Sequence, residues 1–161
     1  MKHVYWVIDH LLAGRPGPHL APWDPTELYA GGLGTVISLA QEEETEDLTP
    51  YGFTHYRASF PPVLLFSRGM RNAFIYQALP VWEFIDQQLE AGNPVLVHCH
   101  HGQDRTGVIL AGYLIVYRNV SPQQALQQLR AAKPTAMSAA GFAEVLGLLR
   151  PGIVPDRRTL L

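Results

Sequence analysis

The chain has 161 residues, of which 47% are hydrophobic and 16% charged, and its formal net charge is −2. This length and hydrophobic content suit one globular domain with a substantial core, so we expect residues 1–161 to form a single domain. A net charge this close to zero argues against a domain that holds nucleic acid through a basic surface. Nucleic acid is therefore not an expected partner.

The chain begins with short apolar segments. Residues 4–8 and 11–13 read as strands, and the glycines and prolines of residues 14–18 predict a turn after them. Asp9 and His10 interrupt the apolar run before it reaches the length of a secretory segment, and no apolar stretch is long enough for a transmembrane helix. We therefore expect a cytoplasmic protein.

A helix is expected to begin after Asp24, which can cap it, with proline at the first helical position and Glu27 placed as a capping-box acid. Residues 35–39 and 54–58 read as further strands. The acidic run 42–47 lies between these two strands. It is expected to be a solvated face rather than a partner site.

Residues 70–91 carry apolar side chains every three or four positions, which predicts a helix with one face against the sheet. Pro80 should kink or restart this helix. Residues 95–97 read as a central strand. Three more helices are expected, over 108–117, after Ser121 and after Ser138. Strands that alternate with helices predict an α/β fold, with a largely parallel twisted sheet of four to five strands and helices on both faces.

The one cysteine of the chain lies in the run His-Cys-His-His-Gly-Gln-Asp-Arg-Thr-Gly, residues 98–107, directly after the expected central strand. Open α/β sheets bind their ligands at the carboxyl ends of strands, which is where this run falls. A single cysteine excludes an internal disulfide and fits a reducing compartment.

The spacing of this run suits a loop that cradles a phosphate dianion. Gly102 can adopt a backbone conformation that other residues resist, so the loop can turn its N–H groups inward above a helix N-terminus. Arg105 can hold two phosphate oxygens with its planar guanidinium group. The same field is expected to keep Cys99 as the nucleophilic thiolate. The expected phosphate-binding residues are His100, His101, Gly102, Gln103, Asp104 and Arg105.

Imidazole and thiolate are also zinc ligands, so residues 98–101 raise the question of a metal site. Consecutive residues on a tight loop cannot all converge on one tetrahedral ion, and no second cysteine supplies the usual paired spacing. We therefore expect no metal and no cofactor. Four scattered histidines are expected to lie at the surface or to be hydrogen-bonded: His3, His10, His19 and His55.

The Cys-x5-Arg-Thr-Gly run resembles that of the cysteine-dependent protein tyrosine phosphatase superfamily, and of its small dual-specificity branch in particular. The resemblance covers most of the chain and implies a protein tyrosine phosphatase-like fold. It also implies that Cys99 forms a phosphocysteine intermediate, that Arg105 binds phosphate and that Thr106 assists departure of the thiolate. His98 would hydrogen-bond locally and tune Cys99.

The chain departs from this family in its general acid. The family carries an aspartate on an upstream loop, but no Asp or Glu occurs between Asp47 and Glu83, and the loop 60–69 is proline-rich and apolar. Some relatives have an aspartate directly before the arginine, so we expect Asp104 to be the general acid and later the base for water. Asp104 could instead orient Arg105 or cap the helix.

The sequence predicts the reaction more specifically than the substrate. Arg68 and Arg71 are possible substrate-rim residues, with Arg57 and Lys133 as further candidates, although each could be a solvated surface cation. We expect a phosphomonoester hydrolase of the protein tyrosine or dual-specificity type that acts on a phosphorylated protein or peptide. The alternatives are a phosphoinositide phosphatase, an RNA triphosphatase and a pseudophosphatase that only binds phosphorylated partners. No feature of the sequence predicts an oligomeric state.

Overall fold

The computed structural model describes residues 1–161, and its centre is one five-stranded sheet in the order β1-β2-β5-β3-β4. Every neighbouring pair is parallel except β1 and β2, which are antiparallel. The predicted largely parallel α/β sheet is therefore confirmed. The strands are β1 (Tyr5–Ile8), β2 (Leu12–Arg15), β3 (Thr35–Ala40), β4 (Thr54–Phe60) and β5 (Val95–His98).

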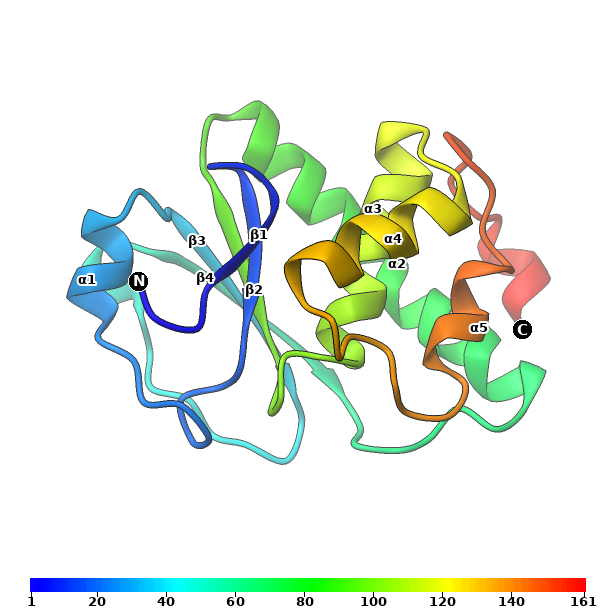
Figure 1. Ribbon diagram of the computed structural model, residues 1–161, viewed down its shortest axis with the longest axis horizontal. Helices are drawn as coiled ribbons and strands as arrows, with labels where there is room; N and C mark the ends of the chain where they lie inside the picture. Colours follow the sequence, from blue (N-terminus) through cyan, green and yellow to red (C-terminus); the bar gives the residue numbers. More distant parts are fainter.

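Helices cover both faces of the sheet, as expected. Figure 1 shows α1 on one side and α2 to α5 on the other, so that the sheet is the middle of three layers. The helices are α1 (Pro25–Ala30), α2 (Arg68–Glu90), α3 (Arg105–Arg118), α4 (Pro122–Ala132) and α5 (Phe142–Leu146), with short 3-10 helices η1 (Thr49–Tyr51) and η2 (Arg157–Leu160). None of them is both long and apolar enough to cross a membrane.

Local capping explains where α1 begins. The Asp24 carboxylate accepts hydrogen bonds from the backbone N–H groups of Thr26 at 3.0 Å and of Glu27 at 3.4 Å, as the sequence predicts. The Glu27 carboxylate does not close a capping box. It lies 3.6 Å from the positively charged amino group of Met1, which is distant in sequence and which the capping pattern does not predict.

Two other local expectations, a restart of the helix at Pro80 and a turn that begins at Gly14, differ from the structure. α2 runs through Pro80 without a restart, because the buried side chains around it, Ala78, Val81 and Trp82, hold both halves of the helix against the core. β2 continues to Arg15 because its pairing with β5 extends to Arg15 and His98. The turn therefore begins after Arg15, later than predicted.

The position of α3 sets the position of residues 99–104, the predicted catalytic loop. Every residue of α3 from Arg105 to Val116 is buried. The indole of Trp82 donates a hydrogen bond to the Ile109 carbonyl at 2.9 Å, and Gly112 leaves room for the indole where any Cβ would collide with it. These contacts fix α3 against α2 with its N-terminus at the carboxyl end of β5, at the lower end of the sheet in Figure 1.

Candidate active site

The loop between β5 and α3 places the sulfur of Cys99 at its base. Cys99 is 2% exposed, and the Thr106 hydroxyl donates a hydrogen bond to its Sγ at 3.1 Å. Gly102 has a φ of 72°, and an added Cβ would lie 2.5 Å from the Arg15 carbonyl carbon, so only glycine fits here. The buried Tyr5 hydroxyl donates to the Gly102 carbonyl, which ties the loop to β1.

The guanidinium of Arg105 is held through its two Nη groups. Its Nη1 and Nη2 donate to the two carboxylate oxygens of Glu42 at 2.6 and 2.7 Å, and Nη1 also donates to the Phe60 carbonyl at 3.0 Å. A guanidinium has five N–H donors, so Nε and the second hydrogen of Nη2 remain free. These two donors lie side by side and form a fork that matches two phosphate oxygens.

Both members of this pair are charged. The hydrogen bond from Arg105 is the main reason that the pKa of Glu42 lies below its usual range. Burial disfavours the charged form of Arg105, but the hydrogen bond to Glu42 and the negative charges of Cys99, Glu42 and Glu43 together outweigh that effect and leave the pKa of Arg105 raised. The guanidinium is therefore fully charged and fixed in its plane before any substrate enters.

Glu42 and Glu43 correct the expectation that residues 42–47 are a solvated face. The Glu43 side chain is only 4% exposed, and its Oε1 is hydrogen-bonded to Nδ1 of His100 in the catalytic loop. The two acids follow the carboxyl end of β3, the edge of the sheet at which Cys99 also lies. That shared edge is the signal by which the sequence could have revealed them.

A directed series of hydrogen bonds reaches the loop from β4 through β3 to the end of β5. The Leu48 N–H donates to Nδ1 of His55 at 3.3 Å, so the proton of His55 is assigned to Nε2, which lies 2.9 Å from Ser38 Oγ. The Ser38 hydroxyl then donates to Nε2 of His98 at 2.6 Å, and Nδ1 of His98 donates to the Cys99 carbonyl at 3.2 Å. The last bond orients the first peptide of the catalytic loop.

The charge states of His55 and His98 are consistent with this series of hydrogen bonds. Burial lowers the pKa of His98 to about 4, and burial also lowers the pKa of His55. Both rings are neutral at pH 7, as the assigned tautomers require. Of the four scattered histidines, His55 is thus half-buried and hydrogen-bonded.

Asp104 is the last residue of the loop, and its carboxylate is hydrogen-bonded to a residue outside the loop. Its Oδ1 accepts a hydrogen bond from the Ala139 N–H at 3.1 Å, and it makes no side-chain cap for α3. The neighbouring Gln103 carbonyl accepts from the Met137 N–H at 3.0 Å. The segment between α4 and α5 is therefore held against the loop, and Oδ2 of Asp104 has no hydrogen-bond partner.

The cations considered for the rim have different surroundings. Arg71 donates to the Leu65 carbonyl and Arg57 to the Thr45 carbonyl, each at 2.8 Å, and the ammonium of Lys133 lies 5.9 Å from the centre of the Tyr5 ring. Arg68 lines a separate hollow with the C-terminal segment. Contact of Arg68 or Arg71 with substrate therefore stays a prediction.

The histidines around Cys99 do not converge on a common point. His98 is buried and bonded to Ser38, His100 is bonded to Glu43, and His101 is exposed. The structure holds no group of three or more His, Cys, Asp or Glu side chains arranged for a metal ion. What the loop does bring together is the Cys99 sulfur and the Arg105 guanidinium, which lie close enough for their charges to interact. A nucleophile beside a forked cation is a site for a phosphoryl group.

Comparison with known proteins gives the family. A profile of the dual specificity phosphatase catalytic domain matches residues 66–150. The protein tyrosine phosphatase domain-containing protein 1 of Mus musculus is 30% identical over 156 residues, which cover 88% of this chain and 21% of the mouse protein. The chain belongs to the dual specificity phosphatase family of the cysteine-dependent protein tyrosine phosphatase superfamily.

Two further comparisons bear on the fold and on the range of relatives. The crystal structure of Tk-PTP in its active form superposes with a TM-score of 0.73 at 22% identity, covering 91% of this chain and 95% of that one, which shows a shared fold. A phosphatidylglycerophosphate phosphatase, PTPMT1 of Arabidopsis thaliana, is 33% identical over 58 residues, or 36% of this chain and 17% of that protein. The chain spans 23% and 21% of the length of protein tyrosine phosphatase domain-containing protein 1 from Danio rerio and from Mus musculus.

Proposed function

We propose that this protein hydrolyses phosphomonoesters through a phosphocysteine intermediate on Cys99. The observation that carries this proposal is the position of the Cys99 sulfur at the base of a loop whose arginine keeps one two-donor edge free. A phosphate that accepts from that edge of Arg105 and from the loop amides has its phosphorus directed toward the sulfur.

The reaction has two steps in which atoms and protons balance. The Cys99 thiolate attacks phosphorus, an S–P bond forms, and the P–O bond to the leaving group breaks as Asp104 gives that oxygen a proton. Asp104 then takes a proton from a water that attacks the phosphocysteine, and the S–P bond breaks to release inorganic phosphate. The hydrogen bond from Thr106 stabilises the departing thiolate.

Asp104 is proposed as the acid because the other nearby carboxylates are occupied. Glu42 is held by Arg105, and Glu43 is buried against His100. Asp104 lies directly before Arg105, is only partly buried, and has one oxygen without a partner. The bond from Ala139 orients the carboxyl group and leaves that second oxygen available.

The proposed substrate is a phosphorylated protein or peptide, with phosphotyrosine preferred. The family profile and the name of the mouse relative support this choice. A phosphorylated lipid is the second candidate, because one relative is named as a phosphatidylglycerophosphate phosphatase and because the loop after β4 exposes apolar side chains, above all Phe66 at 71%. A cytoplasmic location stays a prediction from the single cysteine.

A phosphate-release panel tests the proposal. We expect p-nitrophenyl phosphate to be hydrolysed by the wild type and not by the Cys99→Ser variant. Phosphotyrosine peptides should be turned over faster than phosphoserine peptides, phosphoinositides or triphosphorylated RNA. Binding of a phosphopeptide without turnover above the Cys99→Ser background would instead identify a phosphate-binding pseudoenzyme.

A further inference from the structure

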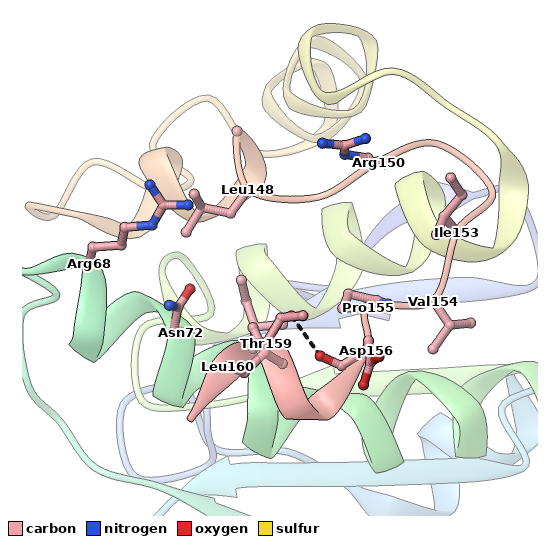
Figure 2. Close-up of a pocket in the computed structure, with 12 residues that line it drawn as sticks. Arg68, Asn72, Leu148, Arg150, Ile153, Val154, Pro155, Asp156, Thr159 and Leu160 are labelled. Atoms are coloured by element: carbon pink, nitrogen blue, oxygen red, sulfur yellow. Dashed lines mark hydrogen bonds between the residues drawn. The ribbon is translucent and has the colours of Figure 1, made fainter.

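A hollow of about 550 Å³ lies between the start of α2, the end of α5 and the C-terminal segment (Figure 2). It shares no residue with the catalytic loop and contains no cysteine, serine or histidine. Its volume lies within the range of sites that bind small ligands. The hollow is therefore a candidate binding site separate from the catalytic loop.

Two arginines without partners line this hollow. The side chains of Arg68 and Arg150 are exposed and make no hydrogen bond, ion pair or ring contact. Figure 2 shows Arg68 at one end of the hollow, on α2, and Arg150 farther along it, on the segment after α5, with Leu148 between them. The other arginines of the chain each donate to an oxygen or lie over an aromatic ring: Arg15, Arg57, Arg71, Arg105, Arg118, Arg130, Arg157 and Arg158. Both arginines of the molecule whose side chains lack a partner therefore line this hollow.

The one acid of the hollow does not neutralise them. The Asp156 carboxylate accepts from Nη2 of Arg158 at 2.8 Å and from the Arg158 backbone N–H at 3.0 Å. The hydrogen bond from the Arg158 side chain is the main reason that the pKa of Asp156 lies below its ordinary value. The hollow therefore carries an excess of positive charge, which favours an anion.

Apolar side chains complete the lining. Ile75 is buried, Leu148 and Leu160 are half-buried, and Ile153 and Val154 remain 55% and 53% exposed. A ligand body that covered these side chains would remove apolar surface from water, which favours binding. Exposed cations together with apolar surface fit a ligand with both an anionic and an apolar part.

We propose that this hollow binds a small amphiphilic anion. Its carboxylate or phosphate head lies between Arg68 and Arg150, and its aliphatic or aromatic body lies against Leu148 and Leu160. The Asn72 amide, which has no side-chain partner, faces the same hollow and can donate to the head group. No cysteine, serine or histidine lines this site, so the proposal concerns binding and does not depend on the hydrolase reaction.

Octanoate is the probe, titrated into the full chain with inorganic phosphate present to occupy the catalytic loop. We expect backbone amide resonances of residues 68–75 and 147–160 to shift in a saturable way. Arg68→Gln and Arg150→Gln should each weaken octanoate binding about tenfold, because each removes a charged donor. Lys2→Gln, which makes the same charge change at an exposed residue elsewhere, should leave the affinity unchanged.

Two matched ligands test the amphiphilic character. 1-Octanol lacks the charge and acetate lacks the apolar body, so each should bind at least about tenfold more weakly than octanoate. Equal affinity for octanol, equal weakening by Lys2→Gln, or shifts confined to other parts of the chain would each overturn the proposal. Circular dichroism and thermal unfolding show whether the variants, which change exposed side chains only, remain folded.

Discussion

Glu42 and Arg105 are joined by two parallel hydrogen bonds of 2.6 and 2.7 Å across 63 residues of sequence. The carboxylate holds the Nη edge of the guanidinium and leaves the Nε side free for phosphate. The same acidic segment reaches His100 through Glu43. The connection between β3 and β4 therefore supports both Arg105 and His100 of the loop.

The first prediction concerns that carboxylate. Glu42→Gln keeps the shape of the side chain but removes its charge, so Arg105 loses its fixed orientation. A charge-assisted hydrogen bond contributes about 1.5–3 kcal/mol, so kcat/KM for p-nitrophenyl phosphate should fall about 10- to 100-fold. Glu44→Gln, in the same acidic run but with an exposed carboxylate, is the control and should keep wild-type activity. Equal activity of both variants would show that Arg105 needs no such support.

The second prediction concerns proton transfer by Asp104. Asp104→Asn should lower turnover of phenyl phosphate by about 10²- to 10⁴-fold, because the phenoxide leaving group needs a proton. The loss on p-nitrophenyl phosphate, whose leaving group is stable without a proton, should be much smaller. The comparison is made by steady-state kinetics on both substrates. Equal losses would argue that Asp104 only anchors the segment at Ala139.

The third prediction concerns the chain of hydrogen bonds behind the loop. Ser38→Ala leaves Nε2 of His98 without its donor in a buried position, which should lower the free energy of unfolding by about 1–3 kcal/mol. It should also reduce kcat/KM by about tenfold, since the Cys99 carbonyl loses a fixed partner. The ¹⁵N shifts of the His98 ring should then report a mixture of tautomers. Ser59→Ala on the exposed side of β4 is the matched control.

The fourth prediction is a dependence of stability on pH. The pKa of His98 is about 4 in the folded protein because the ring is buried, whereas an exposed histidine titrates near about 6.5. The unfolded chain therefore binds more protons between these values, so stability falls as pH falls. We expect the free energy of unfolding to decrease by about 3 kcal/mol from pH 7 to pH 4 through this residue. Urea unfolding across this range measures the slope, and NMR titration of the His98 ring assigns it; a ring that titrates near 6.5 would contradict the account.

Much of the fold follows from local signals. Asp24 and Ser121 mark helix starts, and both cap their helices through side-chain oxygens. The catalytic loop could also be placed, because a buried strand before Cys99 and an apolar run after Thr106 leave the loop between a strand end and a helix start. Each of these patterns acts over a few neighbouring residues.

The supporting residues of the site could not be predicted in the same way. Glu42 and Glu43 lie in an acidic run that is typical of a solvated surface, and only the pairing of β3 with β5 brings them to the loop. The sequence around Ser38 and His55 does not predict their hydrogen bonds, because their partners lie on other strands. Pro80 shows the opposite case, in which tertiary packing holds a helix that a local rule would interrupt.

The most direct test is whether a phosphoryl group is transferred to Cys99. The protein is mixed with p-nitrophenyl phosphate, and the reaction is quenched in acid within the first turnover. The protein is then digested, and the mass of the peptide that contains residue 99 is measured by mass spectrometry. We predict one phosphoryl group on Cys99, a larger amount of it in Thr106→Ala because the thiolate leaves more slowly, and none in Cys99→Ser. Full turnover by Cys99→Ser, or turnover by the wild type with no phosphoryl group on Cys99, would contradict the central claim.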